Sequence, residues 1–244
     1  MARRRDAGGE PTLVWERPEP PSRPAPSPLS RDRIVAAAIR LADADGLEAV
    51  SLRKVAAALD AGPMRLYGYL STKDELLDLM VDAVYGEIPP PAADCDRRAA
   101  LRSLAHGLRR AALRHEWFAD LLGGRPPLGP CALAYLEASL AALDGTPGFT
   151  DADSVAQASR TMHAYVVGAV RNEVAEARAE RATGLDERRW QAAAGPYLER
   201  VLATGRHPAL TKMIREGTHP DAETAFDIGL EQVLDGIGAL LVDR

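Results

Sequence analysis

The sequence predicts an all-α protein, and three observations lead to that prediction. The 244-residue chain is rich in alanine, leucine, arginine and glutamate, which favour helix, and only 5% of its residues are aromatic. Apolar residues recur at helical spacing in one segment after another, with few runs of β-branched residues. Capping residues, glycine and proline stand between these segments, as is typical of helices joined by turns. The length allows one large or two modest domains.

The N-terminal segment, residues 1–29, shows no helical period. It is crowded with proline, glycine, arginine and glutamate, a composition that indicates a disordered tail or an extended arm.

The first helix is expected over residues 30–45. Ser30 can cap it, Asp32 lies favourably near its positive end, and Gly46 can end it.

Residues 51–73 are expected to form two short helices joined by a tight turn. Ser51 is a suitable N-cap for the first of them, whose apolar positions form a single stripe: Leu52, Val55, Ala56 and Leu59. The turn falls at residues 60–62, and Pro63 suits the first position of the next helix, where its missing N–H costs nothing.

The second short helix is expected to have two different faces. Leu66 and Leu70 are four residues apart and can pack on the first helix, which leaves Arg65 and Tyr69 on another face. A helix, a short turn with glycine and a second helix form the helix-turn-helix pattern. The alternative is a solvated helical hairpin.

The charges of this stretch favour an interface with nucleic acid. Arg53, Lys54, Arg65 and Lys73 are opposed only by Asp60, although the whole chain has a net charge of -5. Tyr67 and Tyr69 lie between these cations and could donate hydroxyl hydrogen bonds to phosphates. The local charge decides such binding, so the acidity of the chain does not exclude it.

The run Arg3-Arg4-Arg5 could reach the minor groove from the N-terminal arm; alternatively, the arm only aids solubility.

A fourth helix is expected from Thr72 to about Glu87. Thr72 and Glu75 form a capping box, and residues 89–91 are three prolines that stop the helix. We place a domain boundary at the prolines. The predicted division is therefore an N-terminal arm at 1–29, a helix-turn-helix domain with its connecting helix at 30–88, and a helical-bundle domain at 89–244.

The second domain is expected to consist of helices. The predicted ranges are 96–115, 117–122, 127–144, 151–181, 187–204 and 221–243. The last helix carries more apolar residues than one stripe needs, including Phe226, Ile228, Leu230 and Val233. Such surface predicts a homodimer built from the C-terminal helices. The alternative is a long helix in a monomeric core.

These motifs resemble the tetracycline-repressor (TetR) family of transcriptional regulators. The resemblance rests on the first helix ending in DADG, on VSLRKVAAAL, on RLYGYL and on STKDELLDLM, and behind these on GGRPPLG, HAYVVGAV and AFDIGLEQVLDGIGALL. It implies a DNA-binding first domain and a regulatory second domain. It also implies contacts of Pro63, Arg65 and Tyr69 with base edges. Arg53, Tyr67 and Lys73 are implied to contact base edges or phosphates at the border of the groove.

The regulatory domain is expected to enclose an apolar ligand site. The candidate lining residues are Trp117, Phe118, Tyr135, Met162, His163 and Tyr165, each of which could instead be an ordinary core residue. Tetracycline repressors use a histidine and a glutamate to bind the magnesium–drug chelate, and Leu121 and Asn172 stand at the corresponding positions here. We therefore expect no metal and no cofactor, and an effector that is larger and more apolar.

The function implied is a ligand-responsive regulator, by default a repressor. It would bind a near-palindromic operator in double-stranded DNA as a homodimer and leave it when a small apolar effector binds. The alternative is an effector-independent repressor or an architectural DNA-binding protein. An enzyme is not expected, because the chain has no nucleophile elbow, zinc motif, phosphate loop or Rossmann glycine pattern. The chain has two isolated cysteines, Cys95 and Cys131, and no apolar run of membrane-spanning length. Both features predict a cytoplasmic protein.

Overall fold

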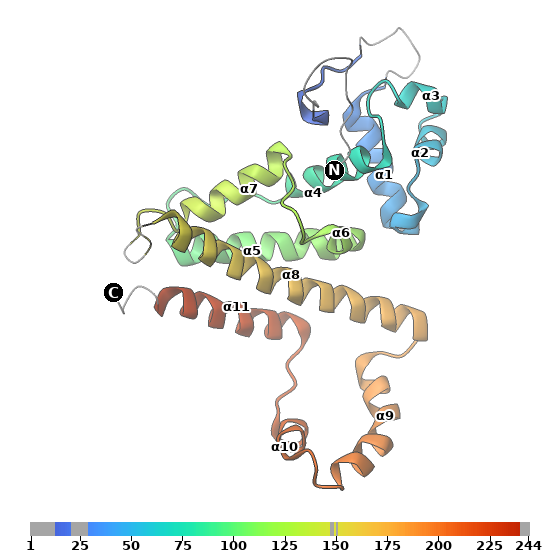
Figure 1. The fold of residues 1–244 in the computed structure, drawn as a ribbon. Coiled ribbons are helices and arrows are strands. Elements are labelled where there is room, and N and C mark those ends of the chain that lie inside the picture. Colours follow the sequence, from blue (N-terminus) through green and yellow to red (C-terminus); the bar gives the residue numbers. More distant parts are fainter. Residues whose placement is uncertain (1–12, 21–28, 147–148, 150, 240–244) are drawn as a thin grey trace.

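The computed structural model describes residues 13–20, 29–146, 149 and 151–239, and within these ranges the regular secondary structure is entirely helical (Figure 1). The all-α prediction is therefore confirmed. The α-helices are α1 (Arg31–Asp45), α2 (Leu52–Ala58), α3 (Pro63–Leu66), α4 (Lys73–Tyr85), α5 (Arg97–Arg114), α6 (Glu116–Leu121), α7 (Pro130–Ala141), α8 (Ala152–Thr183), α9 (Glu187–Leu202), α10 (Pro208–Glu216) and α11 (Ala222–Ala239), with short 3₁₀ helices η1 (Val14–Glu16) and η2 (Leu47–Ala49).

The N-terminal helices pack around α1, which contacts both α2 and α4. Their starts are fixed by the predicted caps. Ser30 accepts from the Arg33 N–H, Ser51 from the Lys54 N–H and Thr72 from the Glu75 N–H. Each hydroxyl satisfies an amide of the first turn that has no partner within its helix. These caps set the lengths and directions of the helices that carry α3.

The C-terminal helices form a bundle around the 32-residue helix α8 (Figure 1). Helix α8 packs on α5, α6, α7 and α11, while α4 contacts α5, α6 and α7. One continuous apolar core therefore runs from Leu29 to Ile237 across the predicted domain boundary. The connecting helix α4 is part of both halves.

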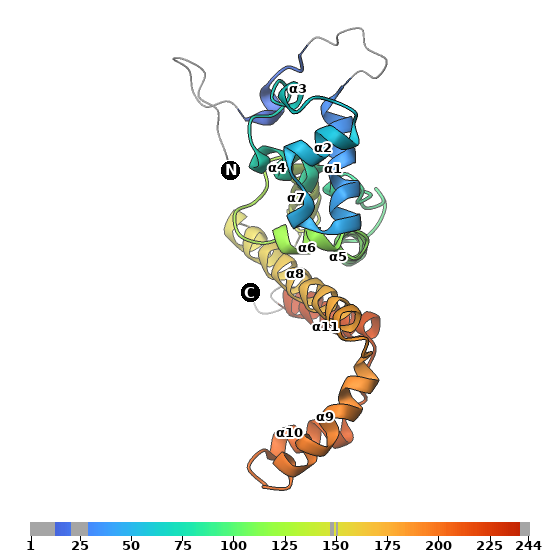
Figure 2. The ribbon, with the colours of Figure 1, turned by 90° about the vertical axis from the view of Figure 1, so that its right-hand side faces the viewer.

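Helices α9 and α10 project away from the rest of the molecule (Figure 2). The sequence did not predict α10, and it placed α9 within 187–204. Large apolar side chains of this projection are exposed, among them Trp190 at 59% and Tyr197 at 65%. No helix in the described ranges is both long and apolar enough to cross a bilayer.

Within the N-terminal segment, predicted as a disordered tail or an extended arm, the structure describes a folded stretch at residues 13–20. Residues 1–12 and 21–28, including Arg3-Arg4-Arg5, lie outside the described residues, but residues 13–20 contain η1 and contact the helix-turn-helix. Val14 is buried, and the Arg17 side chain reaches Ser71 and Glu75. These contacts join residues more than fifty positions apart, so local sequence could not reveal them.

Candidate nucleic-acid interface and regulatory core

The segment α2–turn–α3 presents a cationic face. Val55, Ala56 and Leu66 are buried, which turns Arg53, Pro63 and Arg65 toward solvent. Lys73 is exposed at the start of α4, and Tyr67 is 45% exposed just after α3. The turn places Asp60 at a φ of 50°, a left-handed conformation that aspartate tolerates because its short side chain bonds locally. The structure thus brings five of the six predicted DNA-contacting residues to accessible positions around one short helix.

Tyr69 is the exception, and the prediction for it is corrected. Helix α3 ends at Leu66, so Tyr69 does not continue the face of Arg65. Its side chain is 8% exposed, and its hydroxyl donates a hydrogen bond of 2.9 Å to the Leu29 carbonyl. A buried hydroxyl with that bond cannot also reach a base without disrupting the start of α1. Tyr69 is a core residue here.

Met64 is a candidate that the sequence analysis missed. It lies between Pro63 and Arg65 on α3, and its side chain is 80% exposed. A large apolar side chain in that position could contact the thymine methyl group. The sequence already indicated this exposure. Met64 lies two residues before Leu66, so in a helix that packs through Leu66 its side chain must point outward.

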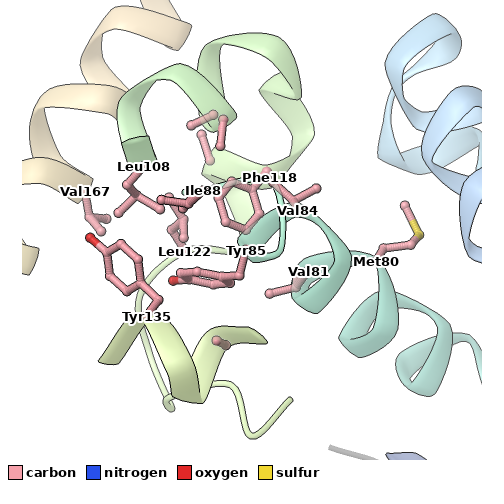
Figure 3. Close-up of a cluster of buried hydrophobic side chains, with 14 of the residues drawn as sticks. Met80, Val81, Val84, Tyr85, Ile88, Leu108, Phe118, Leu122, Tyr135 and Val167 are labelled. Carbon is pink, nitrogen blue, oxygen red and sulfur yellow. The ribbon is translucent and has the colours of Figure 1, made fainter. Parts of the chain in front are cut away.

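The candidate ligand residues do not gather in one site. Phe118 of α6 and Tyr135 of α7 meet at Tyr85 of α4, with ring centroids 5.3 Å from Tyr85 in both cases (Figure 3). We call Tyr85, Phe118 and Tyr135 the ring cluster. Burial raises the pKa of Tyr85 to about 12, and it also raises that of Tyr135. The Tyr135 hydroxyl donates to the Leu104 carbonyl.

Trp117 packs edge-on against Phe118 of the ring cluster, and its polar edge faces α1. Its indole N–H donates to the Asp43 carboxylate at 2.7 Å, and His115 lies between Asp43 and Glu87 at 2.8 and 3.2 Å. Trp117 thus ties α6 to the DNA-binding half.

Met162 is fully buried on α8. Tyr165 faces α11, where its hydroxyl donates to the Phe226 carbonyl at 2.7 Å.

His163 is partly buried on α8, and burial lowers its pKa below the ordinary value, which favours the neutral imidazole. A separate groove of about 380 Å³ lies between the start of α8 and the end of α11, lined in part by Ala158, Val233 and Ile237. None of the six candidate ligand residues lines this groove.

Helix α4 supplies the N-terminal cap of α7. The N-cap residue of α7 is Gly129, which has no side chain to cap the helix, and the Asp82 carboxylate accepts from the Ala132 N–H at 2.9 Å. Asp82 is buried, and the approach is so close that a Cβ on Gly129 would lie 2.6 Å from Asp82 Cβ. Movement of α7 therefore cannot leave α4 unaffected.

The protonation of Asp82 gives a testable consequence. Burial raises its pKa above 3.8, so this carboxyl contributes stability that is fully present below that ordinary value and is lost as pH rises through the raised pKa. Asp82→Asn keeps an oxygen acceptor for the Ala132 N–H but cannot ionise. We expect it to be at least as stable as the wild type at pH 7, with an advantage that shrinks on acidification.

Asp82→Ala is the matched comparison, because it removes the acceptor as well. It should lower the free energy of unfolding by about 0.5–2 kcal/mol, the usual contribution of a cap. Urea unfolding of the three proteins at pH 7 and pH 5 measures both effects. If Asp82→Asn lost as much stability as Asp82→Ala at pH 7, the ionised carboxylate would be required and this account of the cap would be wrong.

Comparison with known proteins agrees with this geometry. Residues 34–80 match the model described as bacterial regulatory proteins, tetR family, and residues 90–241 match the tetracyclin repressor-like C-terminal domain. The HTH-type transcriptional repressor DrrR1 of Streptomyces coeruleorubidus is 40% identical over 234 residues, covering 95% of this chain and 86% of that protein. An HTH-type transcriptional regulator of Saccharopolyspora erythraea is 44% identical over 163 residues, 66% of this chain and 68% of its own.

Solved structures extend the comparison to the fold. ActR of Streptomyces coelicolor, a TetR family protein solved in complex with actinorhodin, superimposes with a TM-score of 0.75 at 29% identity, covering 87% of this chain and 97% of that one. The helix-turn-helix, the regulatory bundle and the relatives that share both lead to one conclusion. This chain belongs to the TetR family of bacterial transcriptional regulators.

Proposed function

We propose that this protein is a ligand-responsive repressor that binds a near-palindromic operator as a homodimer. The observation that carries the proposal is the exposed α3, which offers Pro63, Met64 and Arg65 while Leu66 holds it on the core. Arg65 can give two donors to guanine O6 and N7, the commonest specific pairing in the major groove. Arg53, Tyr67 and Lys73 flank α3, where they can contact phosphates or outer bases.

Exposed apolar surface on the C-terminal helices supports the homodimer. The groove between α8 and α11 is mostly apolar, and Ile228 of α11 is exposed. Helix α9 projects with the exposed aromatic side chains Trp190 and Tyr197, and α10 with exposed Leu210 and Met213. A second copy related by a two-fold axis would cover such surface with the same surface of its own. The two α3 helices would then lie about one turn of DNA apart, or a near multiple, which matches an inverted repeat.

The ring cluster supports control by a largely apolar effector. Phe118 and Tyr135, both candidate ligand residues, contact Tyr85 of the connecting helix directly. A ligand that displaced either ring would move α4 and change the separation of the two α3 helices. It can do so only through its difference in affinity for the two arrangements. ActR, a TetR family protein solved in complex with actinorhodin, supports the binding of a small-molecule effector.

An effector-independent repressor is the second candidate function. The observation that favours it is dense packing, since Trp117, Phe118 and Met162 are at most 2% exposed. A panel of apolar natural products separates the two functions. A compound that raises the melting temperature and also releases operator DNA supports the sensor, whereas turnover of that compound would indicate an enzyme. No shift across a chemically broad panel, with operator binding intact, supports the second candidate.

The division of work at the DNA is tested by two substitutions. Arg65→Ala should relax base preference at one position per half-site and cost roughly 1–3 kcal/mol of specific affinity. Lys73→Ala should weaken all duplexes about equally and reduce the salt slope by about one. Fluorescence anisotropy at several salt concentrations, on operator and single-base variants, measures both. If both variants changed the base preference and the salt dependence of binding in the same way, the assigned roles would be wrong.

A further inference from the structure

Residues 13–20 form a folded segment at the same end of the molecule as α3 (Figures 1 and 2). The N–H of Leu13, the residue before η1, donates to the Glu16 carboxylate at 2.9 Å, and Val14 is buried. The segment lies ahead of the residues that match the family's DNA-binding model, which begin at 34. Its residues therefore lie outside the part of the chain that the family's DNA-binding model matches.

Arg17 makes the central contacts of this segment. One guanidinium N–H donates to Ser71 Oγ at 3.1 Å, and another nitrogen lies 2.5 Å from Glu75 Oε2. The same carboxylate accepts from the Ser71 N–H at 2.6 Å. The side chains of Arg17 and Glu75 are only 15% and 2% exposed. Without Arg17, Glu75 would be a buried charge lacking this cation.

Two further contacts bring the segment against the residues that follow α3. Pro20 lies beside Gly68, where an added Cβ would be 3.4 Å from Pro20 Cγ. Glu19 accepts from the Arg31 N–H at 3.1 Å, and the Arg31 side chain donates to the Tyr69 carbonyl at 3.3 Å. The contacts at Gly68, Tyr69 and Ser71 lie in residues 67–72, the connection between α3 and α4, and the ion pair with Glu75 lies in the first turn of α4.

We propose that residues 13–20 act as a strap that fixes this connection, with Arg17 as its positioning residue for operator recognition. Helix α3 spans only Pro63–Leu66, so its own hydrogen bonds cannot set its direction and its neighbours must do so. The strap holds the C-terminal side of α3, while the packing of Leu66 holds its inner face. The inference rests on the proposed function, because positioning has value only if α3 reads DNA.

The test uses the full chain and an operator that the wild-type protein selects from random duplex DNA. Arg17→Ala removes the strap contact, and Arg17→Ala/Glu75→Gln removes it without leaving a buried unpaired carboxylate. Arg40→Ala is the control, since Arg40 is an exposed cation of α1 in the same domain. Affinity for the operator and for a scrambled duplex is measured after stoichiometric titration gives the active fraction.

The expected result is a loss of affinity for the operator that exceeds the loss of affinity for the scrambled duplex. The double variant should bind the operator about tenfold more weakly, the scale of a charge-assisted hydrogen bond, with less than about a threefold loss on scrambled DNA. Arg40→Ala should reduce both affinities by the same small factor. Ser71→Ala, which retains both charges, should weaken operator binding in the same direction and provides a readout if the Arg17 variants do not fold.

Two results would overturn the strap. One is an operator affinity within about twofold of wild type in the double variant. If the Arg17 variants do not fold, the same result in Ser71→Ala would overturn the strap. The other is an equal loss on operator and scrambled DNA, which would reduce the segment to a source of charge or stability. A wild-type protein that selects no duplex would instead contradict the proposed function itself, so the two failures are distinguishable.

Discussion

Replacing Phe118 by alanine should lower the free energy of unfolding by about 3–5 kcal/mol, the range for removing a fully buried ring. The Phe118 side chain is 0% exposed and contacts two other rings, Tyr85 at 5.3 Å and Trp117 at 6.2 Å between centroids. It lies where α4, α6 and α7 meet, so all three helices would have to move to close the cavity. Urea unfolding monitored by circular dichroism measures the loss.

The same variant also tests how the bundle reaches the DNA. Because Phe118 packs on the connecting helix, the cavity should weaken operator binding as well as folding, and a small apolar solute that fills it should restore part of both. Phe118→Leu is the matched control and should cost much less, because it keeps most of the volume. Operator affinity unchanged in a folded Phe118→Ala protein would separate the ring cluster from regulation.

Local signals predicted the boundaries of the first helices well. Ser30, Ser51 and Thr72 cap the helices that they were predicted to cap, and the Pro63 start of α3 agrees with the structure. These features depend on interactions within three or four residues, which a sequence displays directly. The same reasoning placed Arg53, Arg65 and Lys73 on accessible surface.

The errors arose where tertiary contacts outweigh spacing. Tyr69 is four residues after Arg65, but α3 stops at Leu66 and the Leu29 carbonyl holds the Tyr69 hydroxyl inside. The candidate ligand residues share helical spacing, yet Trp117 bonds to Asp43 and Tyr165 to the Phe226 carbonyl. No period in a sequence states which neighbouring helix a side chain meets.

Helix α10 illustrates a signal that was present and missed. Pro208 stands at its first position, and Leu210, Met213 and Ile214 recur at helical spacing. The helix buries none of its residues in this chain, so it contributes nothing to the core pattern that guided the prediction. It contacts α9, and an amphipathic helix that buries so little of itself in its own chain agrees with the proposed homodimer.

Gly129→Ala should destabilise the protein by about 3 kcal/mol, the sum expected for overpacking a tight contact and losing a cap. The new Cβ would lie 2.6 Å from Asp82 Cβ and closer still to the carboxyl group, and neither backbone can move without separating α4 from α7. Gly168→Ala is the control, because it lies within α8 with open space around it. It should be neutral or stabilising by up to about 1 kcal/mol.

The double variant Gly129→Ala/Asp82→Ala shows whether the clash or the helix start is responsible. Asp82→Ala removes the carboxyl atoms nearest the new methyl group but leaves its own Cβ, so it should recover part of the loss, and the two changes should be clearly non-additive. Additive losses would mean that Gly129 serves the turn before α7 rather than its contact with α4. Partial recovery of operator affinity in the double variant, in parallel with stability, would show that the spacing between α4 and α7 is communicated to the DNA-binding helices.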